Sequence, residues 1–302
     1  VPVQNPPSGW SSIAGNYSSV CALSNVGTVY CWGHNSQGQL GDNTTTNNFI
    51  ARKVTINGNT RPITAIYTSS NYGLNTSVNS FWAIDDMGQV WAWGDNTWGQ
   101  LGNGNTIDQP LPVRSGSAAL NGVFVTKLSI SSSEGTHVAA IGEISGVSKL
   151  YTWGSNGTNG TNGGQLGLGT SGASVSTPAE VTSLGTGITD VVARGQASSN
   201  AFTVVLKSNG TVWTAGNNNT GQAGIGTEDT NLLTFTQANS LGANFITKIY
   251  AMDASGGGQV AAVNSANRVF FTGYNAYGNL GNNTTSQLNS YIEPTDTGFQ
   301  TK

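Results

Sequence analysis

The residues that could perform acid–base chemistry are few and scattered in this chain. It has two histidines, His34 and His137, and an adjacent pair of aspartates, Asp85-Asp86. General acid–base catalysis needs a positioned histidine or a carboxylate whose surroundings have raised its pKa. The histidines occupy different points of their repeats, and the aspartate pair lies where a hairpin turn is expected. We therefore predict that the protein is not an enzyme.

Metal and phosphate sites have no matching pattern either. Asp42-Asn43 and Glu228-Asp229 could supply oxygen ligands to calcium, but their spacing matches no calcium-loop motif. The glycine-rich run 156–164 lacks a lysine and a following helix, both of which a phosphate cradle would use. We expect no metal and no cofactor.

The two cysteines, Cys21 and Cys31, flank a short turn at 24–28. If Leu23 pairs with Val29 across a hairpin, then Cys21 lies directly opposite Cys31. Cysteines opposed on neighbouring strands are close enough to bond, and a disulfide indicates an oxidising compartment. The alternative is two free, buried thiols. We predict the disulfide, which leaves no cysteine as a nucleophile.

The elements that must position these residues repeat five times along the chain. Each copy contains a Trp-type residue followed by glycine, then a loop that ends in Gln-Leu-Gly or a variant of it. The glycines after the Trp-type position are Gly33, Gly94, Gly154, Gly216 and Gly273, at spacings of 61, 60, 62 and 57 residues. A period of this size indicates an array of similar supersecondary units.

Each unit has four short apolar segments separated by turns and no helical periodicity. Four-stranded units repeated around an axis are the blades of a β-propeller. We therefore predict an all-β protein, a single β-propeller domain over residues 1–302. The five repeats span roughly 10–62, 63–123, 124–187, 188–244 and 245–302.

The motif Val-Tyr/Trp-x-Trp-Gly-x-Asn-x-x-Gly-Gln-Leu-Gly, with a later Pro-x-x-Val, resembles the regulator of chromosome condensation repeat. Three copies are sharp, whereas the fourth and fifth have Ala215 and Thr272 at the Trp position. The resemblance implies a β-propeller, usually of seven blades, and we expect a bacterial or viral secreted or surface type. With five copies visible, either the ring closes with five blades or further blades lie in a longer polypeptide. The chain ends resemble repeat interiors, so we expect it to start and stop in mid-unit.

Composition excludes two classes of partner. Only 8% of residues are charged and the net charge is −3, too little to build the basic face that nucleic-acid binding requires. No apolar run approaches the roughly 18 residues of a membrane span, so we expect no membrane insertion. A surface rich in Asn, Thr, Ser and Gly suggests an extracellular protein or one on a cell or virion surface.

The motif residues themselves are expected to be structural: tryptophans as wedges between blades, and the recurrent asparagines as turn caps. Candidate ligand-binding residues are aromatics that replace small or polar residues of other copies. They are Trp98, Tyr274 and Tyr277 in the motif loops and Tyr72 in a long loop at 68–79. Exposed aromatics anchor protein partners or stack on sugars; the alternative is packing against neighbouring loops.

These observations predict an extracellular, non-catalytic β-propeller that acts as a protein- or carbohydrate-binding or adhesion module. Its partner would be another protein, a surface glycan or copies of itself. An alternative is a structural subunit of a filament, sheath or virion surface. The resemblance also includes a guanine nucleotide exchange factor, but that activity would need basic patches that this chain lacks.

Overall fold

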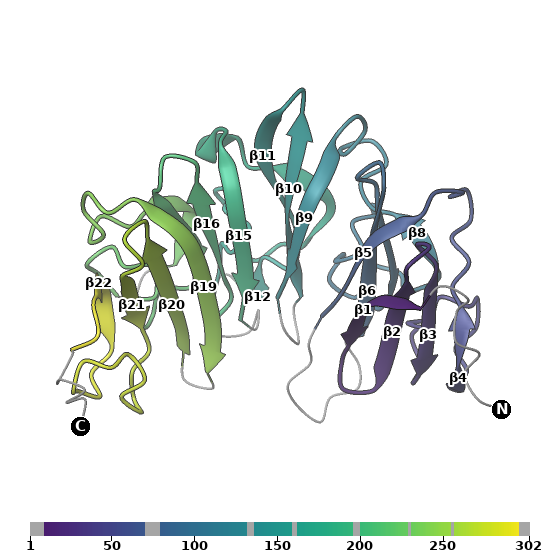
Figure 1. Cartoon of the computed structure of the whole chain (residues 1–302), viewed down its shortest axis with the longest axis horizontal. Helices are drawn as coiled ribbons and strands as arrows, with labels where there is room; N and C mark the ends of the chain where they lie inside the picture. Colours follow the sequence, from purple (N-terminus) through teal and green to yellow (C-terminus); the bar gives the residue numbers. More distant parts are fainter. Residues whose placement is uncertain are drawn as a thin grey trace.

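The computed structural model describes residues 9–69, 79–131, 136–158, 162–195, 200–228, 231–254 and 257–295. Five antiparallel sheets, each of four strands, follow one another around an arc (Figure 1). In the described ranges the helical content is a single 3-10 turn, η1 (Thr182–Leu184). The all-β architecture of four-stranded blades is confirmed.

We number the sheets, with their loops, as blades 1 to 5 in chain order. Blade 1 contains β1 (Trp10–Gly15), β2 (Ser19–Ser24), β3 (Val29–Gly33) and β4 (Asn48–Lys53). Blade 2 contains β5 (Ile63–Thr68), β6 (Ser80–Asp85), β7 (Val90–Gly94) and β8 (Gln109–Arg114). Blade 3 contains β9 (Phe124–Ile130), β10 (His137–Ile144), β11 (Val147–Gly154) and β14 (Val175–Glu180).

Blade 4 contains β15 (Ile188–Arg194), β16 (Phe202–Lys207), β17 (Val212–Gly216) and β18 (Leu232–Gln237). Blade 5 contains β19 (Ile246–Ala254), β20 (Gly257–Asn264), β21 (Val269–Gly273) and β22 (Leu288–Ile292). A small hairpin of β12 (Gly157–Thr158) and β13 (Asn162–Gly163) occupies the insertion in the third motif loop. Each blade is a meander, because strands that follow in sequence also pair in space.

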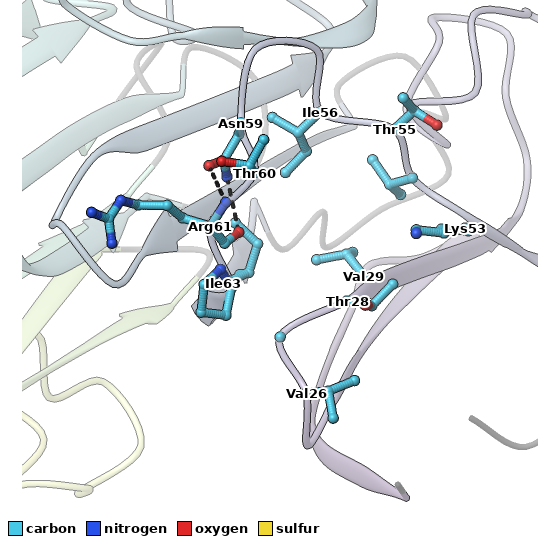
Figure 2. Close-up of a pocket in the computed structure, with 13 residues that line it drawn as sticks. Val26, Thr28, Val29, Lys53, Thr55, Ile56, Asn59, Thr60, Arg61 and Ile63 are labelled. Atoms are coloured by element: carbon cyan, nitrogen blue, oxygen red, sulfur yellow. Dashed lines mark hydrogen bonds between the residues drawn. The ribbon is translucent and has the colours of Figure 1, made fainter. Parts of the chain in front are cut away.

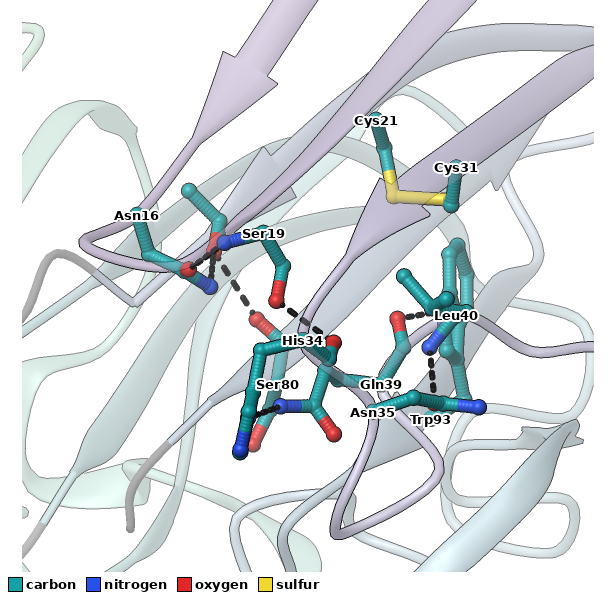
Figure 3. The surroundings of a disulfide bond; sticks show 11 residues. Asn16, Ser19, Cys21, Cys31, His34, Asn35, Gln39, Leu40, Ser80 and Trp93 are labelled. Atoms are coloured by element: carbon teal, nitrogen blue, oxygen red, sulfur yellow. Dashed lines mark hydrogen bonds between the residues drawn. A yellow bond between two sulfur atoms is a disulfide. The ribbon is translucent and has the colours of Figure 1, made fainter. Parts of the chain in front are cut away.

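The cysteine hairpin has the predicted register. Leu23 pairs with Val29 and Cys21 with Cys31, and the turn passes through Gly27 at a φ of +77°, a backbone conformation that favours glycine. The two sulfurs are bonded at 2.02 Å (Figure 3). The predicted disulfide is confirmed, and it links β2 to β3, the two middle strands of blade 1.

The side chains of the two middle strands alternate between the faces of each blade. In blade 1 the disulfide, Leu23 and Val29 point toward blade 2, where they meet Phe81 and Trp93 in one apolar cluster. Three further clusters fill the spaces between blades 2 and 3, 3 and 4, and 4 and 5. The described core is thus divided among four interfaces, each between consecutive blades.

The arc does not close. Figure 1 shows blades 1 and 5 at its two ends, with an opening between the two blades. None of the four apolar clusters joins blade 1 to blade 5. Over the described residues, the five blades therefore form an open arc. No helix in the described ranges could span a membrane.

Candidate functional site

The motif loops are built on one buried asparagine each. Its Oδ1 accepts the backbone N–H of the residue five or ten positions later, and its Nδ2 donates to carbonyl oxygens further along the loop. The same pattern recurs at Asn35, Asn96, Asn156, Asn218 and Asn275. An interior made of such bonds fixes the loop backbone, so the residues that project from it are held on a rigid frame.

Tryptophans pin the first three blades together. Trp93 Nε1 of blade 2 donates to the carbonyl of Gln39 in blade 1 at 2.9 Å (Figure 3). Trp153 Nε1 of blade 3 donates to the carbonyl of Gln100 in blade 2 at 2.8 Å. Both tryptophans are fully buried, so they are the wedges that the sequence predicts.

His137 is enclosed in the interface between blades 3 and 4. Burial lowers its pKa to about 3, so the imidazole is neutral at physiological pH. Its Nε2 lies 2.9 Å from Thr203 Oγ1, and the side chain is inaccessible to solvent. An enclosed neutral imidazole has no path for exchanging a proton with a bound substrate, so His137 has a packing role.

The adjacent aspartates Asp85 and Asp86 make structural contacts as well. Asp85 accepts the backbone N–H groups of Met87 and Gln89, each at 3.0 Å, and the indole N–H of Trp91 at 3.1 Å. Asp86 pairs with Arg61 at 3.1 Å. The aspartate pair therefore holds the hairpin turn, as the sequence predicts.

Asp95 follows the Trp-Gly pair of blade 2 and is buried. Burial raises its pKa to about 6, although hydrogen bonds from Thr97 and Gln100 partly oppose this shift. Gln37 of blade 1 also reaches it, with its Nε2 3.4 Å from Asp95 Oδ1. Sequence reasoning missed this group, since nothing in the motif signals its burial.

The structure brings together two of the four predicted binding residues. The rings of Tyr274 and Tyr277 lie 6.4 Å apart, edge to face, in the motif loop of blade 5. Trp98 is half-buried in the corresponding loop of blade 2, with two blades between it and the tyrosines. Tyr72 lies outside the described residues. The predicted aromatics therefore belong to at least two separate places on the arc.

A hollow of about 580 Å³ lies between blades 1 and 2, and the sequence did not reveal it. Its walls are the hairpin turn Val26–Val29 and the linker Lys53–Ile63 (Figure 2). The guanidinium of Arg61 points away from that turn and pairs with Asp86. Its lining combines aliphatic side chains with the charged residues Lys53 and Arg61 and includes no histidine, cysteine or carboxylate. Within the described part of the chain, no cluster of three or more His, Cys, Asp or Glu could hold a metal.

Repeated four-stranded blades, joined by tryptophan hydrogen bonds between neighbouring blades, define a β-propeller protein. A family model described as the regulator of chromosome condensation (RCC1) repeat matches residues 26–74 and 87–140. A second model of the same repeat matches residues 10–39. The matched residues of this chain are RCC1 repeats, the repeat unit of a β-propeller family.

Curated relatives extend the similarity over most of the chain. The Ultraviolet-B receptor UVR8 of Arabidopsis thaliana is 28% identical over 253 residues, covering 84% of this chain and 50% of the receptor. The mitochondrial RCC1 domain-containing protein RUG3 of the same plant is 29% identical over 219 residues, covering 71% and 44%. The chain thus spans about half the length of these relatives.

Solved structures share the fold. Human WBSCR16 superimposes with a TM-score of 0.68 at 17% identity, covering 95% of this chain and 67% of that protein. Prp20p from Saccharomyces cerevisiae, whose structure is described with its binding to Gsp1p and histones, gives 0.64 at 19% identity, covering 96% and 64%. At these identities the likeness establishes the fold alone.

Proposed function

We propose that this protein is a non-catalytic, extracellular β-propeller that binds another protein through aromatic residues on its motif loops. The observation that carries the proposal is the tyrosine pair of blade 5. Tyr277 is 82% exposed and Tyr274 is partly buried beside it. Large aromatics held in place before binding lose little conformational freedom on contact, which is why they dominate binding energy at interfaces.

The loop that carries this pair is rigid. Asn275, between the two tyrosines, is buried and accepts the backbone N–H of Leu280 at 2.9 Å. Its amide also donates to the carbonyl oxygens of Thr284 and Ser286, each at 3.0 Å. A partner would therefore meet a preformed edge, and Trp98 presents a second anchor on an equivalent loop in blade 2.

An extracellular site is supported by chemistry independent of the loops. The Cys21–Cys31 bond forms and persists in oxidising compartments. A chain with 8% charged residues and a net charge of −3 has no electrostatic attraction for nucleic acid. A protein partner is favoured over a glycan because Prp20p, which shares the fold, is described as binding Gsp1p and histones.

The test is a peptide-display selection against the purified protein. Peptides that survive are measured by calorimetry against the wild type, Trp98→Ala, Tyr277→Ala and the double variant. We expect the double variant to bind at least tenfold more weakly, with an unchanged midpoint of thermal unfolding.

Val147→Ala is the matched control, because Val147 is an exposed apolar residue on the β10–β11 hairpin, away from the motif loops. Peptides that bind the double variant as tightly as the wild type would contradict the assignment of the site. Retention on immobilised polysaccharides in the absence of any selected peptide would favour the carbohydrate-binding alternative.

A further inference from the structure

Each blade is joined to the next by a linker, and the four linkers start in the same way. They span residues 54–62, 115–123, 181–187 and 238–245. The backbone N–H of the first linker residue donates at 2.9 Å to a carbonyl on the third strand of the preceding blade. The donor–acceptor pairs are Val54–Val29, Ser115–Val90, Val181–Leu150 and Ala238–Val212. The linkers can therefore be compared position by position from this bond.

Three of the linkers insert a leucine between the blades that they join. The leucines are Leu120, Leu184 and Leu241. Each is buried and belongs to the apolar cluster of its own interface. Leu184 and Leu241 stand three residues after the first linker residue, and Leu120 stands five residues after it. A leucine side chain thus fills the space beneath the linker at three interfaces.

The linker between blades 1 and 2 has no leucine at either position. Asn57 stands three residues after Val54, and Asn59 stands five residues after it. Ile56 is the large apolar residue nearest to these positions, and it is only half-buried. The hollow of about 580 Å³ described above lies beside it. The space that a leucine fills at the other interfaces is therefore left open here.

The hollow has an apolar base and a fixed wall. Val29, Val54 and Ile63 are the buried apolar side chains of its lining. Asn59 holds the linker, because its Oδ1 accepts the backbone N–H of Arg61 at 2.8 Å and its Nδ2 donates to the Arg61 carbonyl at 3.3 Å (Figure 2). A ligand that enters a preformed site loses less free energy to ordering the protein.

Lys53 gives the hollow a positive charge that no acid of the lining neutralises. The two charged residues of the lining are both basic, and Arg61 turns its guanidinium away to pair with Asp86 (Figure 2). Lys53 is exposed and makes no ion pair among the described residues. In the third linker, Lys207 Nζ donates to the carbonyl of the inserted Leu184 at 2.7 Å, so the chain itself places an amine beside a leucine in such a space.

We propose that the hollow between blades 1 and 2 binds a short segment of a partner protein that carries a leucine followed by an acidic residue. The leucine side chain occupies the space that the linker leucines fill at the other three interfaces, and its removal from water favours binding. The carboxylate pairs with Lys53. Because this charge is exposed, it contributes more to selectivity and salt dependence than to affinity.

This inference goes beyond the proposed function and uses a different part of each blade. The hollow adjoins the turn at 24–28, where β3 begins, whereas the motif loop follows Gly33, where β3 ends. Trp98 and Tyr277 stay unchanged in the experiment below, so that either proposal can fail alone.

The test titrates the protein with a defined peptide, acetyl-Gly-Ser-Leu-Glu-Ser-Gly-amide, and follows methyl signals by NMR. Since one buried side chain carries the contact, we expect weak binding at millimolar peptide. The methyl signals of Ile56 and Ile63 should shift and saturate, while those of Leu120, buried in the next interface, should not. A peptide with alanine in place of leucine should bind at least fivefold more weakly. One with lysine in place of glutamate should bind at least threefold more weakly, and salt should reduce this difference.

Charge selection is tested on β4. Lys53→Gln should remove the preference for glutamate over lysine in the peptide. The matched control is Arg52→Gln, because Arg52 is an exposed neighbour on the same strand that does not line the hollow. It should leave the preference unchanged.

Filling the hollow from within tests the leucine position. Asn57→Leu places a leucine three residues after Val54, as in the third and fourth linkers. It should raise the midpoint of thermal unfolding by about 2 °C or more and weaken peptide binding at least tenfold. Asn121→Leu is the matched control, because Asn121 is exposed in a linker whose space Leu120 already fills; it should change neither quantity.

Four results would overturn the proposal. The Ile56 and Ile63 methyl signals could stay unshifted at every peptide concentration. The leucine and alanine peptides could bind equally well, which would show that the hollow does not take the side chain. Sedimentation could show self-association that Asn57→Leu abolishes, which would make a second copy the occupant. Nuclear Overhauser contacts from the Ile56 methyl groups to residues 1–8 would make the chain's own residues the occupant.

Discussion

The first two interblade interfaces and the last two fill the same space from different strands. Between blades 1 and 2, and between 2 and 3, a tryptophan on the third strand of the following blade occupies the centre. Between blades 3 and 4 that position is Ala215, and between 4 and 5 it is Thr272. The aromatic ring comes instead from the outermost strand, as Phe235 or Tyr291.

The final glycine of each motif lies beside the space that the aromatic ring of the following blade occupies. A Cβ on Gly41 would lie 3.1 Å from Trp93, and one on Gly102 2.8 Å from Trp153. At the equivalent Gly167 the nearest atom is Phe235 Cε2 at 2.3 Å, and Gly224 meets Tyr291 in the same way. In each interface, one aromatic ring of the following blade therefore lies beside this glycine, whichever strand supplies the ring.

In the last two interfaces, a different residue also supplies the hydrogen bond to the carbonyl of the preceding motif loop. Where Ala215 has no N–H to offer, Thr203 on β16 donates to the carbonyl of Gln165 at 2.7 Å. Between blades 4 and 5, Thr272 donates to the carbonyl of Gly221 at 2.8 Å. A buried carbonyl left without a donor destabilises the fold, so loss of the tryptophan is tolerated only where a hydroxyl replaces its N–H.

Removal of a pinning tryptophan should have the largest effect. Trp153→Ala leaves a cavity and removes the shorter of two hydrogen bonds to the Gln100 carbonyl, which keeps only the bond from Trp82 Nε1 at 3.3 Å. We expect it to lower the free energy of unfolding by about 3–5 kcal/mol. Trp32→Ala removes a ring that is only half-buried and should cost under about 1 kcal/mol. Urea unfolding measures both, and equal losses would contradict the distinction between the buried and the half-buried tryptophan.

Asp95 should make the stability of the interface between blades 1 and 2 depend on pH. Its counterpart in blade 4, Asn217, does not ionise and has no such effect. The pKa of Asp95 is raised by burial to about 6 in the folded state and returns to the ordinary range on unfolding, so the folded state binds the proton more tightly. Stability should therefore fall as the pH rises from 4 to 6, by roughly 2–3 kcal/mol. Asp95→Asn should remove this slope in urea titrations at each pH, while Asp42→Asn, on an exposed loop, should not; a slope that persists would contradict the assignment.

A double-mutant cycle can test whether a tryptophan side chain at position 215 would occupy the space that Phe235 fills. Ala215→Trp should overpack the third interface against Phe235 and cost about 1–3 kcal/mol, and Phe235→Ala should cost about 3–5 kcal/mol. If one ring fills the space, the double variant should recover about 1 kcal/mol or more relative to the sum of the two losses. Strict additivity would show that the two rings do not share a site.

The smallest effect is expected at Tyr291. Its hydroxyl is buried with no hydrogen-bond partner in the described part of the chain, and burial raises its pKa. Tyr291→Phe should therefore stabilise the protein by about 1 kcal/mol, because an unsatisfied polar group is removed without loss of the ring. Tyr151→Phe, in the second interface, is the control and should not raise the melting temperature.

The sequence predicted what depends on local pairing. Strand order, the Cys21–Cys31 register and the turn at Asp85 follow from period-two alternation and turn chemistry within one hairpin. The ring exchange between Ala215 and Phe235 could not be predicted, because the two residues lie on strands whose side chains meet only after the blade twists onto its neighbour. The separation of Trp98 from the tyrosine pair, which stays a candidate site, depends on blade order around the arc.

The disulfide has a consequence for how the protein opens. In an array where each unit contacts only its neighbours, local unfolding begins at the ends and propagates inward. The covalent link between β2 and β3 restrains such fraying in blade 1, and blade 5 has no counterpart because Ala261 and Phe271 occupy the equivalent positions. Amide hydrogens of β19 to β22 should exchange before those of β1 to β4, and reduction of the bond should make the two ends alike.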